Sequence, residues 1–184
     1  MPKFVYIDNP SLWAEGRRAS AVKKGKACDI LDSIENNISD MEWSCDVGKL
    51  LRLIGCTKED TKKAYLFGCY PPMSDSLWNE DIRCFLTTMN YWIRNPVDIV
   101  IRMVEDLYVH SISPANNDSV ILVAGDADYV PAVNRLRENG IYVNLRFWDH
   151  ASPELIQAAT EFSSLNPSID GMYREEPSKN ANKT

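Results

Sequence analysis

Three aspartates follow directly after two segments with the pattern of buried strands. Asp8 ends the apolar segment Lys3–Asp8, and Asp126 and Asp128 follow the apolar run 120–124 in the order Gly-Asp-Ala-Asp. Unbroken apolar runs of this length are typical of parallel strands that are covered on both faces. Ligands of such sheets lie outside the carboxyl ends of the strands. We therefore expect the three carboxylates to converge if the two strands are neighbours.

A cluster of carboxylates needs a cation, because two of them ~5 Å apart repel by roughly 3 kcal/mol at an effective dielectric near 20. Mg²⁺ and Mn²⁺ prefer such hard oxygen ligands. A bound cation lowers the pKa of its water and stabilises charge on a phosphorane, so metal-assisted phosphodiester hydrolysis is the chemistry we infer. The plainer alternative is that each Asp is a turn former or a helix cap, and Asp128 suits a cap of the following helix.

The elements that must position these acids alternate along the chain. Apolar runs predict strands over residues 3–8, 63–70, 118–125 and 141–147. Helical spacing and end signals predict helices over residues 27–38, 43–54, 81–92, 96–109 and 128–139, and a last one from 152 that carries Leu155, Ile156, Ala159 and Phe162. This order predicts a three-layer α/β/α, Rossmann-like fold with a mainly parallel central sheet.

Composition limits the class of protein. A chain of 184 residues with 45% hydrophobic residues is the size of one domain, which we place at residues 1–170, and the tail 171–184 is too polar to fold. The net charge of −6 argues against a broad basic surface for nucleic acid but not against a nuclease. Without a signal peptide or a membrane-length apolar run, we expect a cytoplasmic protein with no membrane partner. The five cysteines lack zinc-finger or redox spacing, which predicts free and mostly buried thiols.

Three segments resemble the signature segments of the NYN domain, the group that includes LabA-like proteins. They are Asp8-Asn9-Pro10-Ser11-Leu12-Trp13-Ala14-Glu15-Gly16-Arg17, Pro96-Val97-Asp98-Ile99 and Val123-Ala124-Gly125-Asp126-Ala127-Asp128-Tyr129-Val130-Pro131. The third is the most specific. The resemblance continues through residues 136–143 and 152–155, so that it spans nearly residues 3–166.

The resemblance implies a PIN-like nuclease domain that cleaves RNA with a metal-activated water. Matched position by position, Asp8, Asp98, Asp126 and Asp128 are its catalytic acids. Asp8 and Asp126 would be the main ligands of Mg²⁺ or Mn²⁺, Asp128 a ligand or a water-positioning group, and Asp98 a ligand or an acid behind the ligands. We therefore expect a metal-dependent endoribonuclease acting on RNA, single-stranded in our reading, and we leave a homodimer open.

Two positions depart from the family pattern. The family has an Asn near its first Asp, but here that position is Ser11, although Asn9 remains. A further family acid in the helix after Asp98 falls at Val104, with Glu105 and Asp106 adjacent. Asn9 and Ser11 are therefore candidate polar groups of the site, and Glu105 and Asp106 candidate additional acids.

The densest basic stretch lies shortly after Asp8. It contains Arg17, Arg18, Lys23, Lys24 and Lys26, with Trp13 beside it. We expect either a rim that holds the RNA backbone, with Trp13 stacking on a base, or a solvated loop. His110 and His150 are isolated and are expected to be structural or on the surface. Trp78, Trp92 and Trp148 are expected in the core or an interface.

Other functions remain open. A metal-dependent phosphatase can share such a sheet, but a haloacid-dehalogenase-type enzyme needs an Asp where this chain has Pro10. Nucleoside-triphosphate and dinucleotide sites lack their glycine-rich loops here. A non-catalytic RNA- or protein-binding descendant of the nuclease fold is the main alternative, and Ser11 and the missing helix acid favour it. Metal titration separates it from the enzyme.

Overall fold

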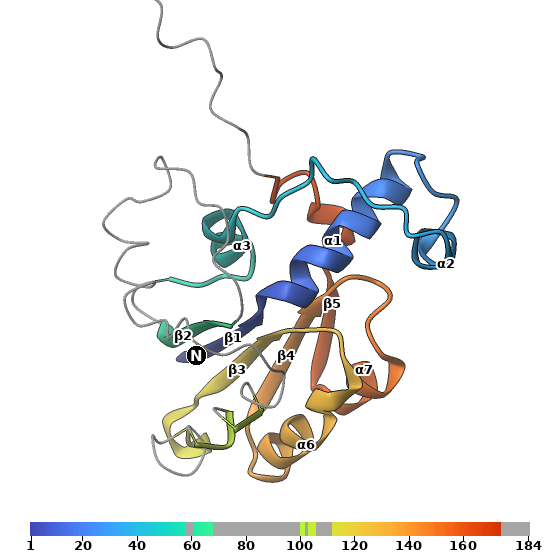
Figure 1. Ribbon diagram of the computed structural model, residues 1–184. Helices are drawn as coiled ribbons and strands as arrows, with labels where there is room; N and C mark the ends of the chain where they lie inside the picture. Colours follow the sequence, from blue (N-terminus) through green and yellow to red (C-terminus); the bar gives the residue numbers. More distant parts are fainter. Residues whose placement is uncertain (58–60, 68–99, 102, 106–111, 174–184) are drawn as a thin grey trace, which may run out of the picture.

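A parallel sheet forms the centre of the molecule. The computed structural model describes residues 1–57, 61–67, 100–101, 103–105 and 112–173. Within this part, strands β1 (Lys3–Asp8), β2 (Thr61–Phe67), β3 (Ser119–Val123), β4 (Tyr142–Phe147) and β5 (Glu161–Ser164) lie in the order β2-β1-β3-β4-β5 (Figure 1). All four neighbouring pairs are parallel. The predicted α/β class is confirmed.

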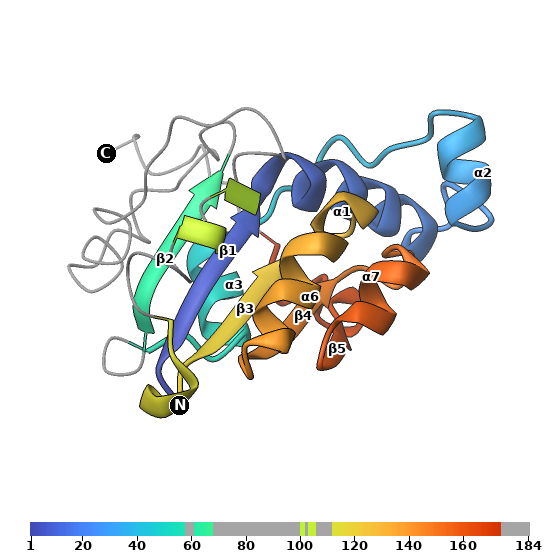
Figure 2. The same cartoon turned by 90° about the horizontal axis from the view of Figure 1, so that it is seen from below.

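Helices cover both faces of this sheet. Helices α1 (Asn9–Lys23) and α3 (Val47–Leu53) lie on one face, and α6 (Val130–Glu138) and α7 (Pro153–Ala158) lie on the other (Figures 1 and 2). The short α2 (Ile30–Glu35) lies beyond the end of α1, and single 3₁₀ turns occur at Pro114–Asn116, Ala127–Tyr129 and Asn166–Ser168. The expected three layers are present.

The two faces of β1 and β3 explain their unbroken apolar sequences. Side chains alternate between the faces of a strand, and here both faces are covered. The face toward α1 and α3 carries Val5, Ile7, Ile121 and Val123. The face toward α6 and α7 carries Phe4, Tyr6, Val120 and Leu122. The core therefore holds β1 and β3 rigidly beside each other, and their acidic ends with them.

Helix α1 packs unusually closely, through small residues. A Cβ atom at Gly16 would lie 2.3 Å from the Trp43 ring and 2.7 Å from the Trp148 ring. These two rings meet edge to face, with centroids 5.5 Å apart. The buried Trp148 indole also donates a hydrogen bond to the backbone oxygen of Leu12, at 3.0 Å. This close packing fixes α1 against the core, and Trp148, expected in the core or an interface, lies in the core.

Several elements differ from the sequence-based predictions. Residues 9–23, where no helix was predicted, form α1. Most of its buried residues are small, so the sequence shows only a weak apolar period there. Phe162 lies in β5 instead of the last helix, because α7 ends at Ala158 and the backbone of Ala159 is extended. Helices α2 and α3 are shorter than predicted.

Some predictions fall outside the described residues. These are residues 68–70 of the second predicted strand, the helix 81–92, Asp98, Asp106, His110, Trp78, Trp92, Cys69 and Cys84. In the predicted helix 96–109, the described residues 100, 101 and 103–105 are helical. Of the described cysteines, all three free, Cys45 is buried, Cys56 partly buried and Cys28 exposed, so burial is less general than predicted.

The carboxyl-terminal part of the described chain stays packed through Tyr173, beyond the domain end predicted at residue 170. Met172 is buried, and its backbone oxygen accepts a hydrogen bond from the Asp46 amide at 2.8 Å. Tyr173 forms an isolated antiparallel bridge with Cys45.

Among the helices described here, none is long and apolar enough to cross a membrane.

Candidate active site at the carboxyl ends of β1 and β3

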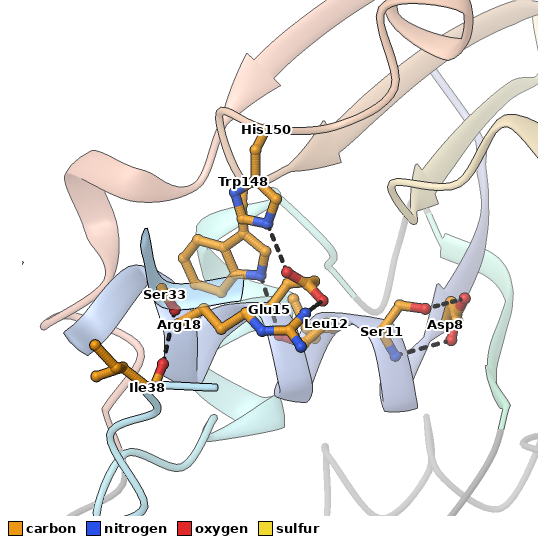
Figure 3. Close-up of polar contacts among 9 residues, drawn as sticks. All are labelled: Asp8, Ser11, Leu12, Glu15, Arg18, Ser33, Ile38, Trp148 and His150. Atoms are coloured by element: carbon orange, nitrogen blue, oxygen red, sulfur yellow. Dashed lines mark hydrogen bonds and ion pairs between the residues drawn. The ribbon is translucent and has the colours of Figure 1, made fainter. Parts of the chain in front are cut away.

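Asp8 is a buried carboxylate held by three donors. It ends β1 and caps the amino terminus of α1, where Oδ1 accepts the Ser11 amide at 3.2 Å. Its Oδ2 accepts the Ser11 hydroxyl at 2.8 Å and the Tyr129 hydroxyl at 2.8 Å; Figure 3 shows the two Ser11 contacts. The helix amino terminus also favours a negative charge at this position. Asp8 is therefore fixed in one orientation, and one of its three contacts comes from Tyr129, which is distant in the sequence.

Asp126 and Asp128 leave the sheet at the same edge as Asp8. In the register of β1 with β3, Ile7 pairs with Val123, so both strands end side by side. Oδ1 of Asp126 accepts the Asp128 amide at 3.0 Å and caps the 3₁₀ turn Ala127–Tyr129. Asp126, and not Asp128, is thus the capping residue of this turn. Helix α6 begins at Val130, and Tyr129, at its N-cap position, makes no side-chain capping bond. Both of these aspartates are exposed.

Tyr129 joins the two acidic segments. Its side chain is completely buried, and its hydroxyl donates to Asp8. Burial raises the pKa of this phenol far above its ordinary value, and the charge and hydrogen bond of Asp8, followed by the charges of Asp126 and Asp128, raise it further. All three carboxylates therefore act on one hydroxyl group. Sequence reasoning missed Tyr129, although its place directly after the Gly-Asp-Ala-Asp turn was a signal.

The turn that carries Asp126 depends on Gly125. A Cβ atom on this residue would lie 2.1 Å from the Phe147 ring at the end of β4. The backbone oxygen of Gly125 accepts the Ser152 amide at 2.8 Å, which ties the turn to the loop after β4. The position of Asp126 is therefore set by the contacts of Gly125 with the end of β4 and with the loop after it.

A second polar group lies along α1, one turn beyond Ser11 (Figure 3). Nε2 of His150 lies 2.8 Å from Oε2 of Glu15, and Arg18 pairs with Oε1 of the same carboxylate. Burial acts to raise the pKa of Glu15, but the His150 hydrogen bond and the Arg18 charge outweigh it and hold the pKa below its ordinary value. His150 is therefore partly buried and paired with Glu15. This agrees with the expectation that His150 is structural or on the surface. No sequence signal pointed to Glu15.

The predicted basic residues lie on α1 and the turn after it, and each has a partner in the protein. Arg17 donates to the backbone oxygens of Trp43 and Met41, and its guanidinium lies 3.9 Å from the Trp13 ring centroid. Lys23 pairs with Asp170 at 2.6 Å. Lys24 and Lys26 both pair with the buried Asp40, at 2.6 and 2.7 Å. Arg17, Arg18 and Lys23 lie on α1, whereas Lys24 and Lys26 are exposed in the turn after it. Contact of these side chains with RNA stays a prediction.

Carboxylate oxygens, which these acids provide, are the ligands that hard divalent cations prefer. A carboxylate offers about four lone-pair positions. Three are used at Asp8 and one at Asp126, whereas Asp128 accepts no hydrogen bond from the described residues. Still, the described part of the chain contains no group of three or more His, Cys, Asp or Glu side chains close enough to hold a metal ion.

Of the other candidate acids, Glu105 is exposed on a helix, and Asp98 and Asp106 lie outside the described residues. Asn9 is buried at the start of α1.

Comparison with known proteins supports the family resemblance. A search of curated proteins found no match. The family model described as the NYN domain matches residues 86–166. This segment contains β3, Asp126, Asp128, Tyr129, α6, β4, α7 and β5, whereas Asp8 precedes it. The NYN domain has a PIN-like fold, and its members are generally nucleases that use divalent metals. Residues 86–166 are thus similar to the NYN domain, the family that the sequence motifs of this chain resemble.

Proposed function

We propose that this protein is a metal-dependent endoribonuclease that hydrolyses phosphodiester bonds of single-stranded RNA at the edge formed by Asp8, Asp126 and Asp128. One observation carries the proposal: the turn with Asp126 and Asp128 follows β3 at the sheet edge where β1 ends in Asp8, and the Tyr129 hydroxyl joins this turn to Asp8. The NYN match over residues 86–166 supports a nuclease.

The residues of the site have separable roles in this proposal. Asp8 and Asp126 are the main ligands of Mg²⁺ or Mn²⁺, Asp128 is a ligand or positions water, and Asp98 supplies a further acid. A bound cation would supply an activated water and offset charge on the phosphate. Ser11 and Tyr129 hold Asp8 in place. The Tyr129 hydroxyl serves as a hydrogen-bond donor to Asp8.

Substrate binding is proposed for the basic side chains of α1 and its following turn. Arg18 and Lys23 are residues of α1, the helix that Asp8 caps, and Lys24 follows its last residue. The Arg17 guanidinium lies over the Trp13 ring. The exposed ion pair between Lys23 and Asp170 is of a kind that contributes little to stability, so Lys23 can exchange its partner for phosphate. The backbone of RNA is therefore proposed to follow α1.

Cleavage of a labelled single-stranded RNA tests this function. The wild type should cut the RNA in Mn²⁺ or Mg²⁺ and not in EDTA, and Asp8→Asn or Asp126→Asn should abolish cutting. Glu138→Gln is the matched control, because it removes one exposed acid on α6 and should leave cleavage unchanged. Cleavage that persists in EDTA, or in Asp126→Asn, would overturn the proposal.

The second candidate is a non-catalytic RNA- or protein-binding module. It is favoured by the three donors that already occupy Asp8 and by the use of Ser11 at the position of the family's Asn. A melting temperature that is unchanged by millimolar Mn²⁺, together with RNA binding and no cleavage, would support this module. A metal-dependent rise in melting temperature that Asp126→Asn removes would support the enzyme.

A further inference from the structure

A pocket of about 390 Å³ lies at the opposite end of α1 from Asp8. Its size falls within the range of small-molecule sites, ~300–1,000 Å³. Most of its wall is apolar and comes from three elements: Ala19 and Val22 of α1, Ile30 of α2, and Ile169 after the turn Asn166–Ser168. All of these lie in the described part of the chain. The proposed nuclease chemistry does not use this pocket.

Polar groups also line the pocket. They are Lys23, Asp149, His150 and Asn166. Oδ1 of Asn166 accepts the Asp149 amide at 3.1 Å, which orients the side-chain amide, and the NH₂ group makes no hydrogen bond within the described residues. The Asp149 carboxylate is exposed and likewise accepts none there. The pocket therefore presents an amide donor, a carboxylate acceptor and a cation beside an apolar wall.

A nucleobase fits this combination. Its faces are flat and pack on apolar side chains, and its edge carries amino donors and carbonyl acceptors. An Asp carboxylate accepts from an amino group such as the cytosine N4. The attached phosphate is attracted by a lysine, and Lys23 is held only by the exposed pair with Asp170.

The pocket is connected to the candidate active site along one face of α1. Ser11, Glu15, Arg18 and Val22 follow one another at spacings of four, three and four residues, which places them on the same side of the helix. His150 lines the pocket and binds Glu15, and Ser11 binds Asp8 (Figure 3). At ~1.5 Å per residue, Ser11 and Val22 are roughly 16 Å apart along the axis, about five stacked nucleotides at ~3.4 Å each.

We propose that this pocket binds a nucleobase, with Asp149 and Asn166 reading its edge and Lys23 holding its phosphate. The base comes either from the RNA strand that passes Asp8 or from a free mononucleotide. Only the first source rests on the proposed nuclease function. Asp149 makes the pocket prefer a base with an amino group, so cytidine monophosphate binds more tightly than uridine monophosphate.

Calorimetric titration of the full chain in EDTA with the two monophosphates tests the proposal without cleavage. We expect cytidine monophosphate to bind the wild type, Asp149→Asn to weaken it about tenfold and remove the preference over uridine monophosphate, and Val22→Trp to abolish binding by filling the pocket. Glu138→Gln is the control, and Asp126→Asn should bind the nucleotide as the wild type does even if cleavage is lost. No binding at millimolar nucleotide, or equal binding by wild type and Asp149→Asn, would overturn the proposal.

The source of the base follows from a second titration, with a single-stranded RNA octamer in the Asp126→Asn background. If the base belongs to the strand, Val22→Trp weakens the octamer about tenfold and the mononucleotide competes with it. If the pocket takes a free nucleotide, the octamer binds both variants equally while only the mononucleotide is lost. Since both titrations are made without metal, loss of cleavage leaves their outcome unchanged, and the mononucleotide titration is also independent of RNA binding.

Discussion

The phenolic oxygen of Tyr129 lies 2.8 Å from Oδ2 of Asp8, although 121 positions separate the two residues in the sequence. Tyr129 belongs to the segment that matches the NYN domain, and Asp8 precedes that segment. This hydrogen bond therefore joins the amino-terminal acid to the turn that carries Asp126 and Asp128, and it accounts for the alignment of the two halves of the proposed site.

Tyr129→Phe should lower the free energy of unfolding by ~1.5–3 kcal/mol, the usual range for a hydrogen bond to a charged group. Denaturant unfolding at neutral pH measures this change. Tyr142→Phe is the matched control, because its hydroxyl makes an exposed bond to Glu161 and the loss should be smaller. Equal losses in the two variants would show that the contact with Asp8 contributes no more than a surface contact.

Asp126→Asn should be more stable than the wild type in EDTA, because it removes one of the charges that converge near Tyr129. The Asn oxygen can still accept the Asp128 amide, so the turn is retained. In millimolar Mn²⁺ the wild type should melt higher than in EDTA, whereas the variant should not change. A lower melting temperature of the variant in EDTA would contradict the predicted repulsion.

Gly125→Ala should lower the free energy of unfolding by ~1–3 kcal/mol, because the new methyl group would overlap the Phe147 ring. The displaced turn should also weaken Mn²⁺ binding. Phe147→Leu in the same chain opens space for the methyl group and should recover part of the metal affinity, which isothermal titration measures. If the double variant binds metal no better than Gly125→Ala, the ring does not position Asp126.

Glu15→Gln should change how stability depends on pH. The pKa of Glu15 is lowered in the folded state, so its carboxylate contributes stability above the unfolded value of about 4.5 and loses that contribution as the pH falls through the lower folded value. The wild type should therefore exceed Glu15→Gln in stability at pH 6, and the difference should shrink below pH 4.5. Melting curves over this range measure it, and a pH-independent difference would contradict the assigned cause.

Replacing Arg18, Lys23 and Lys24 by Gln should weaken RNA binding and reduce its salt dependence, because each lost phosphate contact removes one counterion-release term. Metal affinity should be unchanged. Arg17 is left intact, since it also bonds to the Trp43 and Met41 backbone and its loss would disturb folding. Arg135→Gln, on α6, is the control. An unchanged slope of affinity against salt would show that the RNA path lies elsewhere.

Local patterns in the sequence were sufficient for much of the fold. The apolar runs of β1 and β3 require cover on both faces, so the parallel sheet and its helical layers could be predicted. Helix α1 could not, because it packs through Gly16 and Ala19 and small residues leave little apolar period. Strand β5 was not predicted, because Phe162 was assigned to the last helix, whereas that helix, α7, ends at Ala158.

The sequence by itself determined which acids end the first strand and the strand of the NYN motif, since strand ends and turn residues are local properties of the chain. Only the tertiary structure decided that Tyr129 contacts Asp8, that Glu15 pairs with His150, and that α1, α2 and the loop after β4 enclose a pocket. These contacts join residues that are distant along the chain. Their geometry depends on how the layers pack, and no local pattern of residues records it.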